Sequence, residues 1–192
     1  MPDIIFPKKN ESKFIDIAER LATKEIYFIY PYQKSITDLK NKLKELQKTT
    51  KIKLSLGLSA SPANILKAKN ICNFVITESS GKDQNTMEKL HPNLIFNFEL
   101  SPKKDKPHYR LSGLNQVLCK LASTNNITIG FSFSELLNAL PKRRAILLGR
   151  MIQNLKFCKK FGSPTLFASF AKKPFEMRSL KDFDSFKRVL NK

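Results

Sequence analysis

The fold is decided by one stretch, Ile127–Leu180, which reads ITIGFSFSELLNALPKRRAILLGRMIQNLKFCKKFGSPTLFASFAKKPFEMRSL. The β-branched and aromatic residues of Ile127–Phe133 predict a strand, and Pro164–Ala171 predicts a second strand. Between them, apolar residues recur at helical spacing. Pro141 suits the first turn of this helix, and Gly162 suits its C-terminal cap. The short connection from the helix to the second strand implies that the two strands are parallel.

The rest of the chain repeats this alternation of strand and helix. Five further strands are predicted, at Asp3–Pro7, Glu25–Tyr30, Lys51–Ser59, Phe74–Thr77 and Leu94–Phe98. Alternating units with short connections predict an α/β protein with a parallel sheet, in a single domain over residues 1–192. A closed or nearly closed barrel of seven parallel strands fits best, and a doubly wound open sheet is the alternative. A barrel of seven strands must either leave a gap between its first and last strands or be closed there by a terminal segment.

The charge of the chain is strongly positive. It has 35 Lys and Arg against 16 Asp and Glu, a formal net charge of +19. Residues 138–192 hold 14 of these basic residues against 3 acidic ones. This imbalance predicts a polyanionic partner, with nucleic acid as the first candidate. The alternative is a solvated lysine surface in a generally basic proteome.

The cysteines and the hydropathy pattern bear on the compartment. Cys72, Cys119 and Cys158 lie far apart in the sequence and do not form a metal-binding motif. They are expected to be buried thiols in a reducing compartment. No apolar run reaches membrane-spanning length and no signal peptide is visible, so we expect a cytoplasmic protein without a membrane partner.

Several segments, taken in order and spacing, resemble one family of proteins. They are Gly113-Leu114, Val117–Ala122, Ile129–Phe133, Arg144-Ala145, Ser169, Ala171 and Met177–Ser179. Over roughly residues 108–185 the chain resembles the archaeal ribonuclease P protein component 3 family. The resemblance implies a TIM-like barrel related to the metal-dependent PHP phosphoesterases.

The same resemblance implies a function. It implies a protein subunit of ribonuclease P, the ribonucleoprotein that removes 5′ leaders from precursor tRNA. In that family the RNA subunit performs the hydrolysis with Mg²⁺, so the protein alone is expected to bind no cofactor and to cleave nothing. The implied partners are the ribonuclease P RNA, protein component 2 in a heterotetramer, and the other ribonuclease P proteins. Two alternatives remain open: a general RNA-binding protein and a degenerate PHP-type phosphoesterase.

The sequence predicts no catalytic residue and no metal ligand. PHP-type sites need several His and carboxylates, whereas this chain has only His91 and His108, far apart. Where family members often carry Asp-His, this chain has Asn115 and Gln116, which keep hydrogen-bonding capacity without titrating. Asn115 is therefore expected to cap a helix.

Three serines and one phenylalanine near the strand ends need an explanation. Ser132, Ser134 and Ser169 lack a nucleophile elbow and a neighbouring His, so they are expected to be turn and cap hydroxyls. Phe170 either plugs the barrel mouth or stacks on a partner, and the sequence does not decide between these.

Basic residues near the predicted strand ends and along the last helices are the stronger functional signal. The predicted RNA-binding residues are Arg110, Lys142, Arg143, Arg144, Arg150, Lys172, Lys173 and Arg178. Guanidinium groups suit phosphate oxygens because they donate in a fork. For Lys172 and Lys173 the alternative is a solvated loop.

The position of each arginine on its helix refines this prediction. A helical wheel places Arg143, Arg150 and Asn154 on a solvent face. Arg144 and Arg178 should lean over the barrel mouth; for Arg178 the alternative is a salt bridge to Glu176, Asp182 or Asp184, or a cap on a neighbouring loop. Tyr109, in the loop Ser101–Gly113, is the predicted base-stacking residue.

Overall fold

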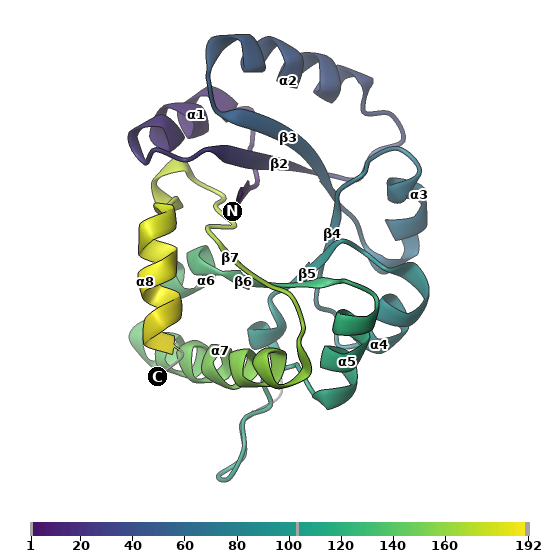
Figure 1. Cartoon of the computed structure of the whole chain (residues 1–192), viewed down its shortest axis with the longest axis vertical. Coiled ribbons are helices and arrows are strands. Elements are labelled where there is room, and N and C mark those ends of the chain that lie inside the picture. Colours follow the sequence, from purple (N-terminus) through teal and green to yellow (C-terminus); the bar gives the residue numbers. More distant parts are fainter. Residues whose placement is uncertain (1, 103, 191–192) are drawn as a thin grey trace.

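The strands form one parallel sheet that curls into a ring. The computed structural model describes residues 2–102 and 104–190. The described strands are β1 (Asp3–Ile5), β2 (Glu25–Pro31), β3 (Lys53–Ser59), β4 (Val75–Glu78), β5 (Leu94–Phe96), β6 (Thr128–Ser132) and β7 (Thr165–Ala168). They pair in chain order, and every pair is parallel (Figure 1). The prediction of seven parallel strands is confirmed.

Helices cover the outside of this ring, as Figure 1 shows. The α-helices are α1 (Glu11–Arg20), α2 (Thr37–Thr49), α3 (Ile65–Lys69), α4 (Asp83–Asn85), α5 (Gln116–Thr124), α6 (Phe133–Asn138), α7 (Pro141–Phe161) and α8 (Leu180–Leu190). Short helical turns are η1 (Pro62–Asn64), η2 (Thr86–Leu90), η3 (Phe98–Leu100) and η4 (Pro174–Glu176). Among the described helices, none is long and apolar enough to cross a membrane.

The helix-end residues behave as the sequence predicts. Pro141 occupies the first turn of α7, and Gly162 caps its end with a φ of 67°. The side chain of Asn115 accepts a hydrogen bond from the backbone N–H of Leu118 at 2.9 Å and so caps α5. These three residues fix where the long helices begin and end.

The barrel closes between its first strand and the segment after its last strand. Ile5 pairs with Ala171 in a parallel bridge. The backbone N–H of Phe6 donates to the Ala171 carbonyl at 2.8 Å, and the Ala171 N–H donates to the Ile4 carbonyl at 3.2 Å. The sequence predicted either a gap or closure by a terminal segment, and the structure shows closure by the segment after β7. The TIM-like barrel is confirmed over the open doubly wound sheet.

A buried carboxylate reinforces this seam. The side chain of Asp3, 1% exposed, accepts hydrogen bonds from the Ser169 N–H at 2.7 Å and the Ser169 Oγ at 2.6 Å. Burial raises the pKa of Asp3 to about 6, although the hydrogen bonds from Ser169 and Ile4 act in the opposite direction. Asp3 and Ser169 are 166 residues apart, so sequence reasoning missed this pair.

Phe170 fills the interior of the barrel. It is 1% exposed, has a φ of 48°, and stacks on Phe96 with ring centroids 4.8 Å apart. A Cβ atom at Gly130 would lie 2.8 Å from the Phe170 ring, so only glycine leaves room for that ring. The interior cluster contains Ile4, Ile29, Ile76, Leu94, Phe96, Leu166, Ala168 and Phe170. Of the two roles predicted for Phe170, plugging the barrel is therefore the correct one.

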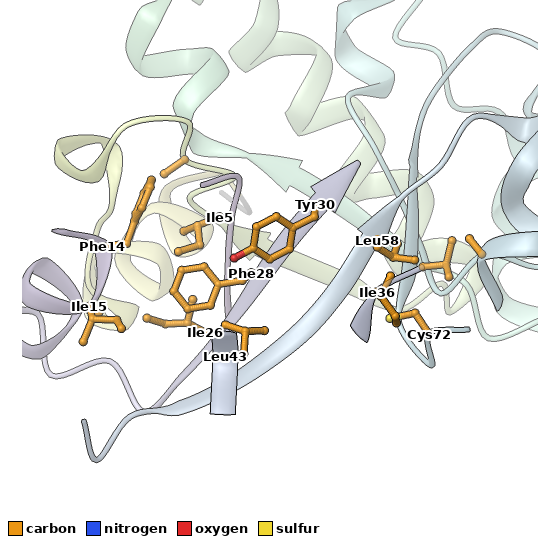
Figure 2. Packing of buried hydrophobic residues seen from close by; sticks show 14 of the residues in the cluster. Ile5, Phe14, Ile15, Ile26, Phe28, Tyr30, Ile36, Leu43, Leu58 and Cys72 are labelled. Carbon is orange, nitrogen blue, oxygen red and sulfur yellow. The ribbon is translucent and has the colours of Figure 1, made fainter. Parts of the chain in front are cut away.

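Two further apolar clusters attach the helices to the outer surface of the barrel. Figure 2 shows one of them, in which Phe14 of α1 lies beside Ile26 and Phe28 of β2. The other packs α5, α7 and α8 against β6 and β7, with Phe131 and Phe167 stacked at 4.7 Å. Strand residues thus pack on both faces, which explains their nearly continuous apolar sequence.

The seam generates a prediction about pH. The pKa of about 6 in the folded state lies above the ordinary 3.8, so between about pH 4 and pH 6 the folded chain binds the Asp3 proton more readily than the unfolded chain. The stability contributed by Asp3 should therefore fall as pH rises through this window, by about 3 kcal/mol in total.

Asp3→Asn should remove this dependence. Relative to wild type, the free energy of unfolding of the variant should improve steadily from about pH 4 to about pH 6, as measured by denaturant melts. The other carboxylates titrate in both proteins, so their contribution cancels in the difference between the two free energies of unfolding. A constant difference across this range would show that Asp3 does not titrate in the folded protein.

Candidate nucleic-acid interface

The loops that follow β6 and β7 interlock. Asn138, the last residue of α6, donates through Nδ2 to Glu176 Oε1 of η4 at 3.0 Å. Lys172 Nζ lies 3.0 Å from Glu135 Oε1 of α6. The carboxyl ends of parallel strands lie at one end of a barrel, so these contacts join the two predicted basic loops into one surface.

Glu176 fixes the shape of the second loop. Its Oε2 accepts from the backbone N–H groups of Lys172 and Lys173 at 2.8 and 3.1 Å. Burial would raise the pKa of Glu176, but the hydrogen bonds from Asn138 and from these two N–H groups lower it below its ordinary value. The carboxylate is thus ionised and holds both lysines at the loop surface.

The lysines and the first arginine of this surface are exposed. Lys142, Arg143, Lys172 and Lys173 all have exposed side chains, and Lys172 also pairs with Glu135. We refer to Lys142, Arg143, Lys172 and Lys173 as the basic rim. The geometry suits long-range attraction to phosphates, and phosphate binding by these residues stays a prediction.

The guanidinium of Arg144 donates hydrogen bonds to backbone carbonyls of the protein. Its Nε donates to the Leu136 carbonyl at 2.9 Å, and its Nη2 donates to the carbonyls of Leu137 and Ala139 at 3.1 and 2.9 Å. These oxygens belong to the end of α6, where carbonyl groups lack helical partners. Arg144 therefore stabilises the end of α6, a role that the sequence did not predict.

Arg178 is half-buried against α6. Its Nη1 donates to the carbonyls of Phe175 and Met177 at 2.9 and 2.7 Å, and its guanidinium lies 5.6 Å from the Phe133 ring centroid. Its alternative partners Glu176 and Asp182 are bonded elsewhere, Asp182 to Ser179 at 2.7 Å. Among the described residues, Arg178 is not part of an ion pair. It thus caps its own loop and packs on an aromatic ring.

The prediction that Arg150 lies on a solvent face is wrong. Its side chain is 2% exposed, and its Nε and Nη2 lie 3.0 and 2.9 Å from Asp105 Oδ1. Its Nη1 donates to the carbonyls of Glu99 and Ser101 at 2.8 and 2.7 Å. Because the loop between β5 and α5 covers this face of α7, the guanidinium is enclosed by the protein and is unavailable to RNA.

Asn154 is also buried, one turn further along α7. It is 0% exposed and donates through Nδ2 to Glu99 Oε1 and to the Ser112 carbonyl, both at 3.0 Å. Burial raises the pKa of Glu99 to about 7, and the bonds from Asn154 and the charge of Arg150 act against this rise. The helical wheel correctly grouped Arg150 with Asn154, but it assigned the pair to the wrong environment.

Arg110 lies on the loop that covers α7. Gln153 accepts from the Arg110 N–H at 3.3 Å and donates to its carbonyl at 2.8 Å. A Cβ atom at Gly149 would lie 2.0 Å from Arg110 Nη1, so the absence of a side chain at Gly149 leaves room for the guanidinium. Arg110 is exposed and its guanidinium lies beside Gly149 in the middle of α7, whereas Lys142 and Arg143 lie in the first turn of that helix.

The ends of β4 and β5 border an open pocket of about 940 Å³, most of whose lining residues are polar. Its lining includes Glu78, whose Oε1 accepts from Asn97 Nδ2 at 2.7 Å, and the capping residue Asn115. Within the described residues, no three His, Cys, Asp or Glu side chains are grouped as metal ligands. The lining offers hydrogen bonds and charge, and its acids are held by neighbouring groups.

The three serines are buried and hydrogen-bonded. Ser132 Oγ and Ser134 Oγ are 3.2 Å apart, and Ser134 Oγ donates to the Phe170 carbonyl at 3.0 Å. Ser169 binds Asp3, as described above. The prediction of turn and cap hydroxyls is therefore wrong for Ser134 and Ser169, whose hydroxyls join segments 36 and 166 residues apart, and Ser132 makes no helix-cap hydrogen bond.

Fold and site together define a closed parallel α/β barrel with a basic surface on the loops that follow its last strands. No protein-family model matches the chain. Ribonuclease P protein component 3 of Methanosarcina mazei is 35% identical over 78 residues, which cover 41% of this chain and 33% of that protein. The component 3 protein of Methanocaldococcus jannaschii is 25% identical over 173 residues, covering 85% of this chain and 72% of that protein. The predicted resemblance to archaeal ribonuclease P protein component 3 is thereby confirmed.

A solved structure agrees with this relation at the level of the fold. A chain in a complex described as archaeal ribonuclease P with mature tRNA matches with a TM-score of 0.84 and 24% sequence identity. The match covers 100% of this chain and 83% of that chain. The match to the Methanosarcina mazei relative spans only 33% of that protein's length.

The contrast between Arg150 and Arg143 can be measured directly. Arg150→Ala should lower the free energy of unfolding by about 3–5 kcal/mol, because it leaves Asp105 and buried carbonyls without their donor. Arg143→Ala, on the exposed first turn of the same helix, should unfold like wild type. Denaturant melts of both variants give the comparison. Equal stability of the two variants would contradict the buried role of Arg150.

Proposed function

We propose that this chain is a protein subunit of ribonuclease P that supports RNA-catalysed removal of 5′ leaders from precursor tRNA. The similarity to Methanocaldococcus jannaschii component 3 over 173 residues carries the proposal. The fold shared with a chain of the archaeal ribonuclease P complex and the net charge of +19 support it.

In this proposal the contribution of the protein is electrostatic. Lys142 and Arg143 of the basic rim lie in the first turn of α7, and Glu176, itself bound by Asn138, fixes the backbone at Lys172 and Lys173, so the backbone that carries these charges is ordered before RNA arrives. Lysine and arginine side chains neutralise phosphates where RNA strands approach one another. Hydrolysis then belongs to the RNA subunit with its Mg²⁺, and the protein lowers the Mg²⁺ concentration that the folded RNA requires.

The proposed partners are the ribonuclease P RNA, protein component 2 in a heterotetramer, and the other ribonuclease P proteins. Two large apolar side chains beside the basic rim favour a protein contact here. Leu140 is 78% exposed and Phe175 is 82% exposed. The hydrogen bond between Asn138 and Glu176 brings their two loops together. Large apolar side chains gathered on a surface are typical of protein interfaces.

Reconstitution tests the proposal. Purified chain alone should leave precursor tRNA intact at any Mg²⁺ concentration. Added to ribonuclease P RNA and the other protein subunits, it should lower the Mg²⁺ concentration at which cleavage is half-maximal. An unchanged Mg²⁺ requirement, or metal-stimulated cleavage by the chain alone, would contradict the proposal.

Removing the charges of the basic rim should weaken RNA binding in a salt-dependent way. The triple variant Lys142→Ala, Arg143→Ala, Lys173→Ala should bind ribonuclease P RNA more weakly than wild type. Each lost phosphate contact should reduce the slope of log K against log salt by roughly 0.7–0.9. Filter binding over a range of KCl concentrations measures this slope.

A matched control removes the same charge elsewhere. The variant Lys40→Ala, Lys44→Ala, Lys48→Ala alters exposed lysines of α2, on the opposite side of the ring from α7 in Figure 1. It should keep the wild-type slope. If the two triple variants behave alike, binding depends on net charge and not on the basic rim.

A further inference from the structure

The loop between η3 and α5 extends outward from the barrel between α5 and α7, as Figure 1 shows. A tight turn forms its outer part, where the Lys106 N–H donates to the Tyr109 carbonyl at 2.9 Å. His108 and Tyr109 are exposed on this turn, Tyr109 at 58%. We refer to residues 104–110 as the outer turn.

The base of the outer turn is anchored in the protein interior. Asp105 Oδ1 is bound by the buried guanidinium of Arg150 and also accepts from the Leu111 N–H at 2.9 Å. On the other side, Gln153 of α7 holds both backbone groups of Arg110. The turn is thus fixed at both of its ends, although its outer residues face solvent.

The charge of the outer turn is positive. It contains Lys104, Lys106 and Arg110, all exposed. Its acidic residue, Asp105, is paired with Arg150; burial would raise the pKa of this carboxyl, but the hydrogen bonds from Arg150 and Leu111 and the charges of Arg150 and Arg110 lower it below its ordinary value. Tyr109 therefore stands on an anchored turn that also carries three exposed cations able to contact phosphates.

We propose that the outer turn is a binding site for unpaired RNA, in which Tyr109 stacks on an unpaired base and Lys104, Lys106 and Arg110 contact the adjoining phosphates. The inference rests on the proposed function, because it takes RNA as the ligand, and it adds the class of RNA and the residues. An exposed aromatic ring among cations suits a splayed-out base, whereas bases within a duplex already stack on one another. A turn held before binding loses little conformational entropy on binding.

The absence of tryptophan from the sequence gives a direct test. Tyr109→Trp places the only tryptophan of the variant on the outer turn, where its fluorescence can be excited selectively. Oligouridine should quench the fluorescence of this variant by stacking, and the same oligouridine annealed to oligoadenosine should quench it much less. The matched control is Val189→Trp on α8, also exposed at 64%, which should be insensitive to both RNAs.

Affinity measurements complete the test. Tyr109→Ala should weaken binding of oligouridine about tenfold or more, and Tyr109→Phe should keep near wild-type affinity, because stacking needs the ring and not the hydroxyl. Equal quenching by single-stranded and duplex RNA, or unchanged affinity of Tyr109→Ala, would overturn the inference. Quenching by an acidic peptide but not by oligouridine would assign the turn to a protein partner instead.

These outcomes are separable from those of the proposed function. Oligouridine binding is measured without ribonuclease P RNA or its other proteins. A chain that supports precursor-tRNA cleavage but shows no stacking at Tyr109 would refute only this inference. A chain that stacks on oligouridine but leaves the Mg²⁺ requirement of ribonuclease P unchanged would refute only the proposed function.

Discussion

A pair of hydrogen bonds to the buried carboxylate of Asp3 links the two ends of the barrel. Without this seam, β1 and the segment after β7 would be free edges of an open sheet. The Ser169 hydroxyl that donates to Asp3 also accepts from the Arg178 N–H at 3.3 Å, so the seam continues directly into the basic loop after β7. The proposed RNA-binding surface is therefore continuous with the barrel seam, where a buried acid adds side-chain hydrogen bonds to the backbone bonds between β1 and the segment after β7.

Helix α7 carries arginines with opposite roles. Its first turn exposes Arg143 to solvent, whereas Arg150, two turns later, is enclosed by the loop between η3 and α5. The buried guanidinium satisfies Asp105 and two backbone carbonyls, and it thereby holds a long irregular loop on the barrel surface. In this chain a basic side chain contributes to RNA binding either directly, by facing phosphates, or indirectly, by fixing the backbone that presents other cations.

Local sequence signals predicted most of the fold, and the errors arose where distant segments meet. Runs of β-branched residues identified the strands, and Pro141, Gly162 and Asn115 marked helix ends, because these effects act over a few residues. The environment of Arg150 depends on Asp105, which is 45 residues away, and periodicity along α7 holds no information about that loop. Within the candidate site, the exposure of the basic rim agreed with the sequence prediction, whereas the partners of Arg144 and Arg178 did not follow from it.

The central claim is that this chain acts as part of a ribonucleoprotein built on ribonuclease P RNA. The most direct measurement is to purify the native protein with its partners from its own cells at low salt and to sequence the RNA that accompanies it. The account predicts strong enrichment of ribonuclease P RNA, lost when the preparation is washed at high salt. Recovery of the protein without RNA, or with ribosomal RNA alone, would contradict it.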